Sequence, residues 1–148
     1  SRSQINPLNA LVAADFDGIA LPGGQGAALH LSTWAQDGAR ARVLPDLQKA
    51  LLDFHSQSKP IGAICIAPAI VACVLGKKNV TVTIGQDAAT IQEIQKTGAQ
   101  HEECPVDDYI TDRLHKIVTT PAYMLSSALP HQVFKGISGL VREFIEMA

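Results

Sequence analysis

Residues 61–65, Ile-Gly-Ala-Ile-Cys, form an apolar run without a polar side chain. A strand that faces water on one side alternates apolar and polar residues, whereas a strand of a parallel sheet is covered on both faces and reads as a continuous apolar run. Pro68 follows at once, and proline suits the first turn of a helix. The stretch therefore predicts a buried parallel strand that turns into a helix directly after Cys65.

Strand and helix patterns alternate along the rest of the chain. Pro45 suits the first position of a helix, Asp87 suits an N-cap, and Gly76 and Gly98 suit helix ends. From the apolar spacing we expect strands at 16–21, 61–65, 80–84, 109–111 and 116–119, and helices at 27–34, 45–55, 69–75, 88–97 and 124–147, the last kinked or split at Pro130. This alternation predicts a single α/β domain over 1–148 with a mainly parallel sheet.

The start of the chain is weakly patterned for about fifteen residues and then enters a strand of buried character at 16–21. A buried strand needs a neighbour on each side. We therefore expect a strand–helix–strand unit of the domain to precede residue 1 and to be absent from this sequence.

Composition excludes several classes of function. The formal net charge is −2, and no basic block is longer than Lys77-Lys78, so a nucleic-acid-binding face is not expected. The longest apolar stretch is interrupted by Gly62 and Pro68, so no membrane span is expected. Three cysteines without a Cys-x-x-Cys pair favour neither a disulfide framework nor a zinc site. A reducing compartment fits best, either the cytoplasm or a mitochondrial matrix.

Two of the expected strands end in chemically suggestive residues at the same edge of the sheet. The first ends in Pro22-Gly23-Gly24, where glycines allow positive φ and can turn N–H groups outward as an anion nest. The second ends at Cys65, beside a helix N-terminus whose partial positive charge stabilises a thiolate. The N–H of Ile66 would face an oxyanion formed on an attacked carbonyl. This is the arrangement of a nucleophile elbow, with cysteine in place of serine.

A purely structural interpretation of these residues stays open at this point. Free cysteine is often a small buried hydrophobe, so Cys65 can be packing material. The same interpretation is favoured for Cys73, on the following helix, and for Cys104, beside Pro105. The glycine loop, taken alone, can be an ordinary turn.

Several stretches resemble the ElbB-like subfamily, the isoprenoid-biosynthesis proteins with an amidotransferase-like domain, in the PfpI-type class I glutamine amidotransferase-like superfamily. Residues 17–28 are similar to the glycine loop of that superfamily, and residues 59–68 to its cysteine elbow. Cys-Pro-Val-Asp-Asp at 104–108 and Lys-Ile-Val-Thr-Thr-Pro-Ala-Tyr-Met at 116–124 resemble the tail of the subfamily. The similarity covers nearly the whole chain, but not the beginning of the family domain.

The resemblance implies a flavodoxin-like three-layer sandwich, often a homodimer. It implies that Cys65 is the nucleophile and that Gly24 and Ile66 supply the oxyanion N–H groups. It further implies a glyoxalase-like lyase that converts small α-oxoaldehydes such as glyoxal and methylglyoxal to 2-hydroxy acids through a hemithioacetal at Cys65, with no metal and no cofactor.

The chain departs from the pattern of the superfamily in two ways. The glutamate that usually contacts the elbow cysteine would lie in the expected unit before residue 1. A histidine usually ends the strand after the elbow, but this strand ends Thr83-Ile84-Gly85-Gln86. The glycine loop also has Gln25 where the subfamily more often has Phe, and Leu29-His30 where it has Lys-Asn.

None of the five histidines stands out as the partner of Cys65. His101, in a His-x-Glu spacing with Glu103, is expected at the surface, and His30 is expected nearest the pocket but without a role in it. His55, His115 and His131 are expected to face solvent. Tyr123 could line the pocket or serve as packing.

Two alternatives to an enzyme remain. An exposed reactive cysteine could act as a redox sensor, because a thiolate oxidises readily to sulfenic or sulfinic acid. The domain could also be a non-catalytic binding module that retains the elbow. Glutaminase activity ranks last, since its histidine is missing.

Overall fold

The strand predicted from the apolar run lies in the middle of the sheet. A computed structural model describes residues 4–148. In it, β2 (Ile61–Ile64) pairs in parallel with β1 (Ile19–Leu21) on one side and with β6 (Ile117–Thr120) on the other. β5 (Ile110–Asp112) pairs antiparallel with β6, which gives the order β1-β2-β6-β5. The prediction of a mainly parallel sheet is confirmed.

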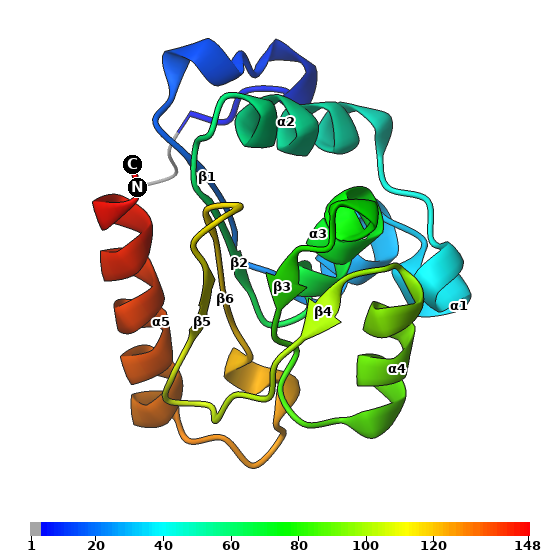
Figure 1. Ribbon diagram of the computed structural model, residues 1–148, viewed down its shortest axis with the longest axis vertical. Helices are drawn as coiled ribbons and strands as arrows, with labels where there is room; N and C mark the ends of the chain where they lie inside the picture. The colour runs from blue at the N-terminus through cyan, green and yellow to red at the C-terminus, as the bar shows by residue number, and fades with distance from the viewer. Residues whose placement is uncertain (1–3) are drawn as a thin grey trace.

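Helices cover both faces of this sheet (Figure 1). α5 (Pro130–Glu146) lies on one face, and α2 (Pro45–Ser56) and α3 (Ala67–Leu75) lie on the other. Gly62 lets α5 approach closely, because a Cβ at this position would lie 3.3 Å from Phe144 and 3.5 Å from Leu140. On the opposite face Ile61 and Ala63 are completely buried. The layers are those of the flavodoxin-like sandwich that the resemblance implies.

A second, two-stranded sheet extends the first. β3 (Thr81–Val82) and β4 (Gln100–His101) run parallel and are connected by α4 (Ala88–Lys96). Side chains tie β3 to the main sheet: Thr81 N–H donates to Asp112 Oδ2 at 2.7 Å, and Thr83 N–H donates to Thr119 Oγ1 at 2.9 Å. The carboxyl ends of β3 and β6 therefore lie side by side.

Two predicted helices are wrong in their bounds. In place of one helix over 27–34 the chain forms a π-helix (Ala27–Leu31) and then α1 (Trp34–Asp37). Ser32 separates them, because it is extended, pairs with Val43 and accepts the Trp34 N–H on its hydroxyl. A 3-10 helix (Gly38–Arg40) follows α1.

The predicted helix over 124–147 is split at Pro130, one of the two forms expected, but its first part is not an α-helix. A 3-10 helix (Ala122–Met124) comes first, and α5 begins at Pro130, which has no N–H to leave unpaired at a helix start. Further 3-10 turns cover Leu8–Ala10 and Ala13–Asp15.

Gly76 does not end α3 in the way predicted. Its φ of −55° is helical, and the chain continues into a 3-10 turn (Gly76–Lys78) that Asn79 ends at a φ of +62°. Glycine is needed there for space, because a Cβ would lie 2.6 Å from the Thr97 carbonyl oxygen. The predicted cap at Asp87 and the helix end at Gly98, with a φ of +96°, are confirmed. Across residues 4–148, no helix has the length and apolar character that a membrane crossing requires.

Candidate active site

Cys65 occupies a sharp turn between β2 and α3. Its φ is +61°, a left-handed conformation that residues with a Cβ seldom adopt. The next residue, Ile66, caps the start of α3, and Pro68 lies in the first turn of that helix. Cys65 N–H donates to the carbonyl oxygen of Thr120 at 3.0 Å, which fastens the turn to the end of β6. The half-buried thiol is thus held at the N-terminus of a nine-residue helix.

The glycine loop lies against this turn. Gly23 and Gly24 have φ angles of +84° and +93°. A Cβ on Gly23 would overlap the carbonyl oxygen of Ile64 and lie 3.1 Å from the Cβ of Cys65. A Cβ on Gly24 would meet nothing within 4 Å, so this residue borders open space. The structure therefore brings together the three residues that sequence analysis proposed for the site, Gly24, Cys65 and Ile66, while their chemical roles stay predictions.

The other two cysteines are in environments that suppress a thiolate. Cys73 is half-buried in α3, where burial raises its pKa to about 11. Cys104 is 2% exposed and donates to the carbonyl oxygen of Pro105 at 3.3 Å. Burial, followed by the negative charges of Asp108, Glu102 and Asp107, raises the pKa of Cys104 to about 12. Both thiols stay protonated at neutral pH, in agreement with their predicted structural roles.

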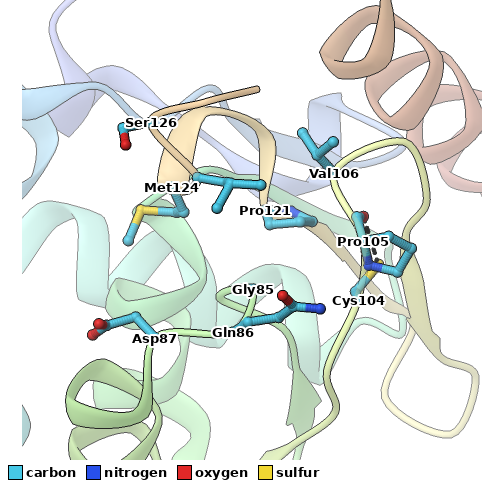
Figure 2. Close-up of a pocket in the computed structure, with 10 residues that line it drawn as sticks. Gly85, Gln86, Asp87, Cys104, Pro105, Val106, Pro121, Met124 and Ser126 are labelled. Atoms are coloured by element: carbon cyan, nitrogen blue, oxygen red, sulfur yellow. Dashed lines mark hydrogen bonds between the residues drawn. The ribbon is translucent and has the colours of Figure 1, made fainter. Parts of the chain in front are cut away.

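A cavity of about 270 Å³ opens at the carboxyl ends of β3 and β6, next to the elbow (Figure 2). Its wall includes Val106, which belongs to the apolar cluster against which Cys65 packs, and Pro121, which directly follows Thr120. The sulfur of Cys65 does not itself line the cavity. The full set of lining residues is Gly85, Gln86, Asp87, Cys104, Pro105, Val106, Pro121, Met124, Leu125 and Ser126.

Sequence analysis missed this cavity. At residues 83–86 the sequence had indicated only that a histidine is absent from the end of that strand. The available signal was Gly85, a glycine directly after an apolar strand, whose φ of +96° turns the chain along the cavity. A Cβ on Gly85 would lie 3.3 Å from Pro121, so the two strand ends are in close contact.

His101 is not the surface residue predicted. It is half-buried in β4, and its Nε2 accepts the Ile84 N–H at 3.0 Å. Burial lowers the pKa of His101, partly offset by Glu103 and Glu102. The ring is therefore neutral with its proton on Nδ1, and it supports the turn from Ile84 into Gly85 instead of acting as a partner for Cys65.

Two further histidines differ from the prediction. His55, in the last turn of α2, and His115, in the β5–β6 turn, are half-buried and stack with ring centroids 5.2 Å apart. His55 Nε2 and His115 Nδ1 are 3.0 Å apart and share a hydrogen bond. This pair sits at the amino ends of β2 and β6, away from the elbow.

The remaining candidates are exposed. His131 faces solvent as predicted. His30 is also exposed, and it borders an open groove with Cys73 instead of the cavity beside Cys65. Tyr123 is 55% exposed and is not part of the cavity wall. Within residues 4–148, no three histidine, cysteine, aspartate or glutamate side chains are grouped so that they could hold a metal ion.

Comparison with known proteins extends the match beyond single motifs. No protein-family model matches the sequence. The human glutamine amidotransferase-like class 1 domain-containing protein 3, mitochondrial, is 39% identical over 156 residues, which cover 99% of this chain. A crystal structure of the Ehrlichia chaffeensis isoprenoid biosynthesis protein with amidotransferase-like domain superposes on 95% of the chain with a TM-score of 0.86 and 31% identity. Over nearly its whole length the chain is similar to proteins of the class I glutamine amidotransferase-like family.

Other relatives and solved structures resemble the chain to different degrees. The rat ES1 protein homolog, mitochondrial, is 37% identical over 99% of the chain. A ThiJ/PfpI domain protein from Brachyspira murdochii, at 14% identity and a TM-score of 0.61, shares the fold. The chain spans 57% and 58% of the lengths of the human and rat relatives, and 63% of the Ehrlichia chain.

Proposed function

We propose that the protein is a glyoxalase-like enzyme that converts small α-oxoaldehydes to 2-hydroxy acids through Cys65. The observation that supports this most is the left-handed turn at Cys65, which presents a half-buried thiol at the N-terminus of α3 beside the glycine loop. A thiolate there can add to an aldehyde carbon. The N–H groups of Gly24 and Ile66 would then stabilise the oxygen that becomes negatively charged.

The proposed reaction balances with water as the only second reactant. The thiolate bonds to the aldehyde carbon and forms a hemithioacetal. The hydrogen on that carbon leaves as a proton, and a proton is returned to the neighbouring carbon, which gives a 2-hydroxy thioester. Water hydrolyses the thioester and releases the 2-hydroxy acid and the thiol. The resemblance implies that a glutamate is the base that moves the proton.

Replacement of the thiol tests this function. In the purified protein, Cys65→Ala should reduce conversion of methylglyoxal to lactate to the uncatalysed rate, measured by NMR. Cys73→Ala is the matched control, because it removes a half-buried cysteine from α3, the helix that follows the elbow, and leaves the elbow itself unchanged. This variant should convert methylglyoxal at the rate of the parent protein. Unchanged turnover in Cys65→Ala would rule the proposal out.

We also propose that the protein works as a homodimer, in the cytoplasm or, in a eukaryote, in the mitochondrial matrix. The names of the human and rat relatives describe those proteins as mitochondrial. Phe134, Val141 and Ile145 are exposed along one side of α5, and this apolar strip suits burial against a second copy. Light scattering of the purified protein should give twice the mass of the chain, and a monomer at micromolar concentration would refute the dimer.

A further inference from the structure

The cavity beside the elbow shares residues with the surroundings of Cys65. Cys65 N–H is bonded to the carbonyl oxygen of Thr120, the residue before the cavity-lining Pro121. Cys65 also packs against the cluster that contains Val106 and Ala122, and Val106 lines the cavity. A substrate attached to Cys65 that extends toward β6 would therefore reach this cavity.

The cavity is a place for binding and not for a second reaction. Cys104 is the nucleophilic residue in its wall, but that thiol is bonded to the Pro105 carbonyl, and its pKa is raised to about 12. Figure 2 shows the Gln86 amide directed toward the wall made by Cys104 and Pro105. A bound group would thus meet an amide that can donate or accept a hydrogen bond.

The remaining lining is mostly apolar, with its one charge negative. Val106, Pro121, Met124 and Leu125 supply apolar surface. The Asp87 carboxylate lies at the opposite end of the view from Cys104, and hydrogen bonds from Thr90 lower its pKa and keep it ionised. Among the described residues that line the cavity, there is no lysine, arginine or histidine. A carboxylate or phosphate bound there would lie near a negative charge without a cation to balance it.

The volume also sets a size for the occupant. At about 30 Å³ for each water-sized group, 270 Å³ holds roughly nine of them. Methylglyoxal is much smaller than this, so it would leave most of the cavity to water. An aryl or branched alkyl group would fill it and displace that water.

We propose that this cavity holds the non-reacting end of the substrate and selects uncharged, largely apolar α-oxoaldehydes of about the size of phenylglyoxal over acidic or phosphorylated ones. The proposal rests on the proposed chemistry at Cys65 for the reaction, but the selectivity belongs to the cavity and can be measured without turnover.

Turnover gives the first measurement. The value of kcat/KM for phenylglyoxal should exceed that for methylglyoxal by about tenfold or more, as burial of a few carbons in a fitted pocket gives. A phenylglyoxal that carries a ring carboxylate should lose this advantage. Ser126→Trp should reduce the phenylglyoxal-to-methylglyoxal ratio, because it fills the cavity. The matched control is Ser127→Trp, at an exposed neighbour outside the wall, and it should keep the ratio of the parent protein.

Alkylation of Cys65 gives the second measurement, which needs no catalysis. Cys65 should prefer N-phenyl iodoacetamide over iodoacetamide. Its ratio of the two alkylation rates should exceed the same ratio for N-acetylcysteine by about tenfold or more. Ser126→Trp should abolish this preference and Ser127→Trp should not. Gln86→Lys should create a preference for a reagent with a carboxylated ring, because it places a cation in the wall.

The two measurements separate the outcomes. An aryl preference in alkylation without aldehyde turnover would support the cavity and remove the glyoxalase function. Turnover without an aryl preference in either assay would overturn the cavity proposal and leave the function standing. Equal ratios in the parent, Ser126→Trp and Ser127→Trp would also overturn it.

Discussion

At the scale of single residues, the backbone conformation of Cys65 determines the geometry of the site more than its side chain does. A φ of +61° costs a residue with a Cβ about 1 kcal/mol or more. The turn is held in place by the Thr120 carbonyl on one side and by Gly23 on the other. Such a conformation places a half-buried thiol at a strand end while the N–H of the same residue stays bonded.

This strain predicts an unusual order of stability. Cys65→Gly should be more stable than Cys65→Ala by about 1 kcal/mol, because glycine adopts positive φ without the Cβ penalty. At Cys73, inside α3, the order should reverse by about the same amount, since glycine weakens a helix interior. Urea unfolding of the four variants measures this. Alanine as the more stable residue at both positions would show that the turn at 65 is not left-handed.

At the scale of elements, side chains hold β3 beside the main sheet. Asp112 is buried and accepts two backbone N–H groups, that of Thr81 at 2.7 Å and that of His115 at 3.0 Å. One carboxylate thus fixes both the start of β3 and the turn that joins β5 to β6. Since the end of β3 forms one side of the cavity, this tether also positions Gly85 and Gln86.

Removal of the tether should destabilise the protein. Asp112→Ala leaves two partly buried donors without an acceptor, and we expect the free energy of unfolding to fall by about 2 kcal/mol. Asp112→Asn keeps one acceptor oxygen and loses the other, so its loss of unfolding free energy should be smaller. Chemical denaturation gives both values, and an alanine variant as stable as the asparagine variant would contradict this account.

The elements themselves could be predicted well from local signals. The apolar run at 61–64, the cap at Asp87 and the β5–β6 hairpin carry their own patterns, and all three are found. Contacts between distant residues carry no such pattern. His55 and His115 are separated by 60 positions, and nothing local shows that the end of α2 meets the β5–β6 turn. The cavity was missed for the same reason, because the segments after β3 and β6 and residues 104–106 each supply part of its wall.

At the scale of the whole molecule, the buried histidines make stability depend on pH. The pKa of His55 is lowered first by burial and then by the charges of His115 and Lys78, while Asp112 acts in the opposite direction. Burial also lowers the pKa of His101. Because the unfolded chain takes up protons at these positions before the folded chain does, folding loses stability as the pH falls below the ordinary histidine value of about 6.5.

We therefore expect the free energy of unfolding to decrease between pH 7.5 and pH 5.5. His55→Gln should make this decrease smaller, since one of the two groups responsible is gone. His131→Gln, at an exposed position, is the control and should leave the slope as in the parent protein. Urea titrations at several pH values measure the slopes. A parent protein whose stability does not change over this range would contradict the prediction.

The central claim is that Cys65 is a poised thiol, and its alkylation rate tests this most directly. With iodoacetamide at neutral pH and site-by-site mass spectrometry, Cys65 should react several-fold faster than N-acetylcysteine, because the left-handed turn presents its thiol at the start of α3, beside the glycine loop. Cys73 and Cys104 should stay unmodified over the same time, since burial raises their pKa to about 11 and about 12. A rate at Cys65 no faster than that of N-acetylcysteine would show that the elbow has a structural role and does not make the thiol reactive.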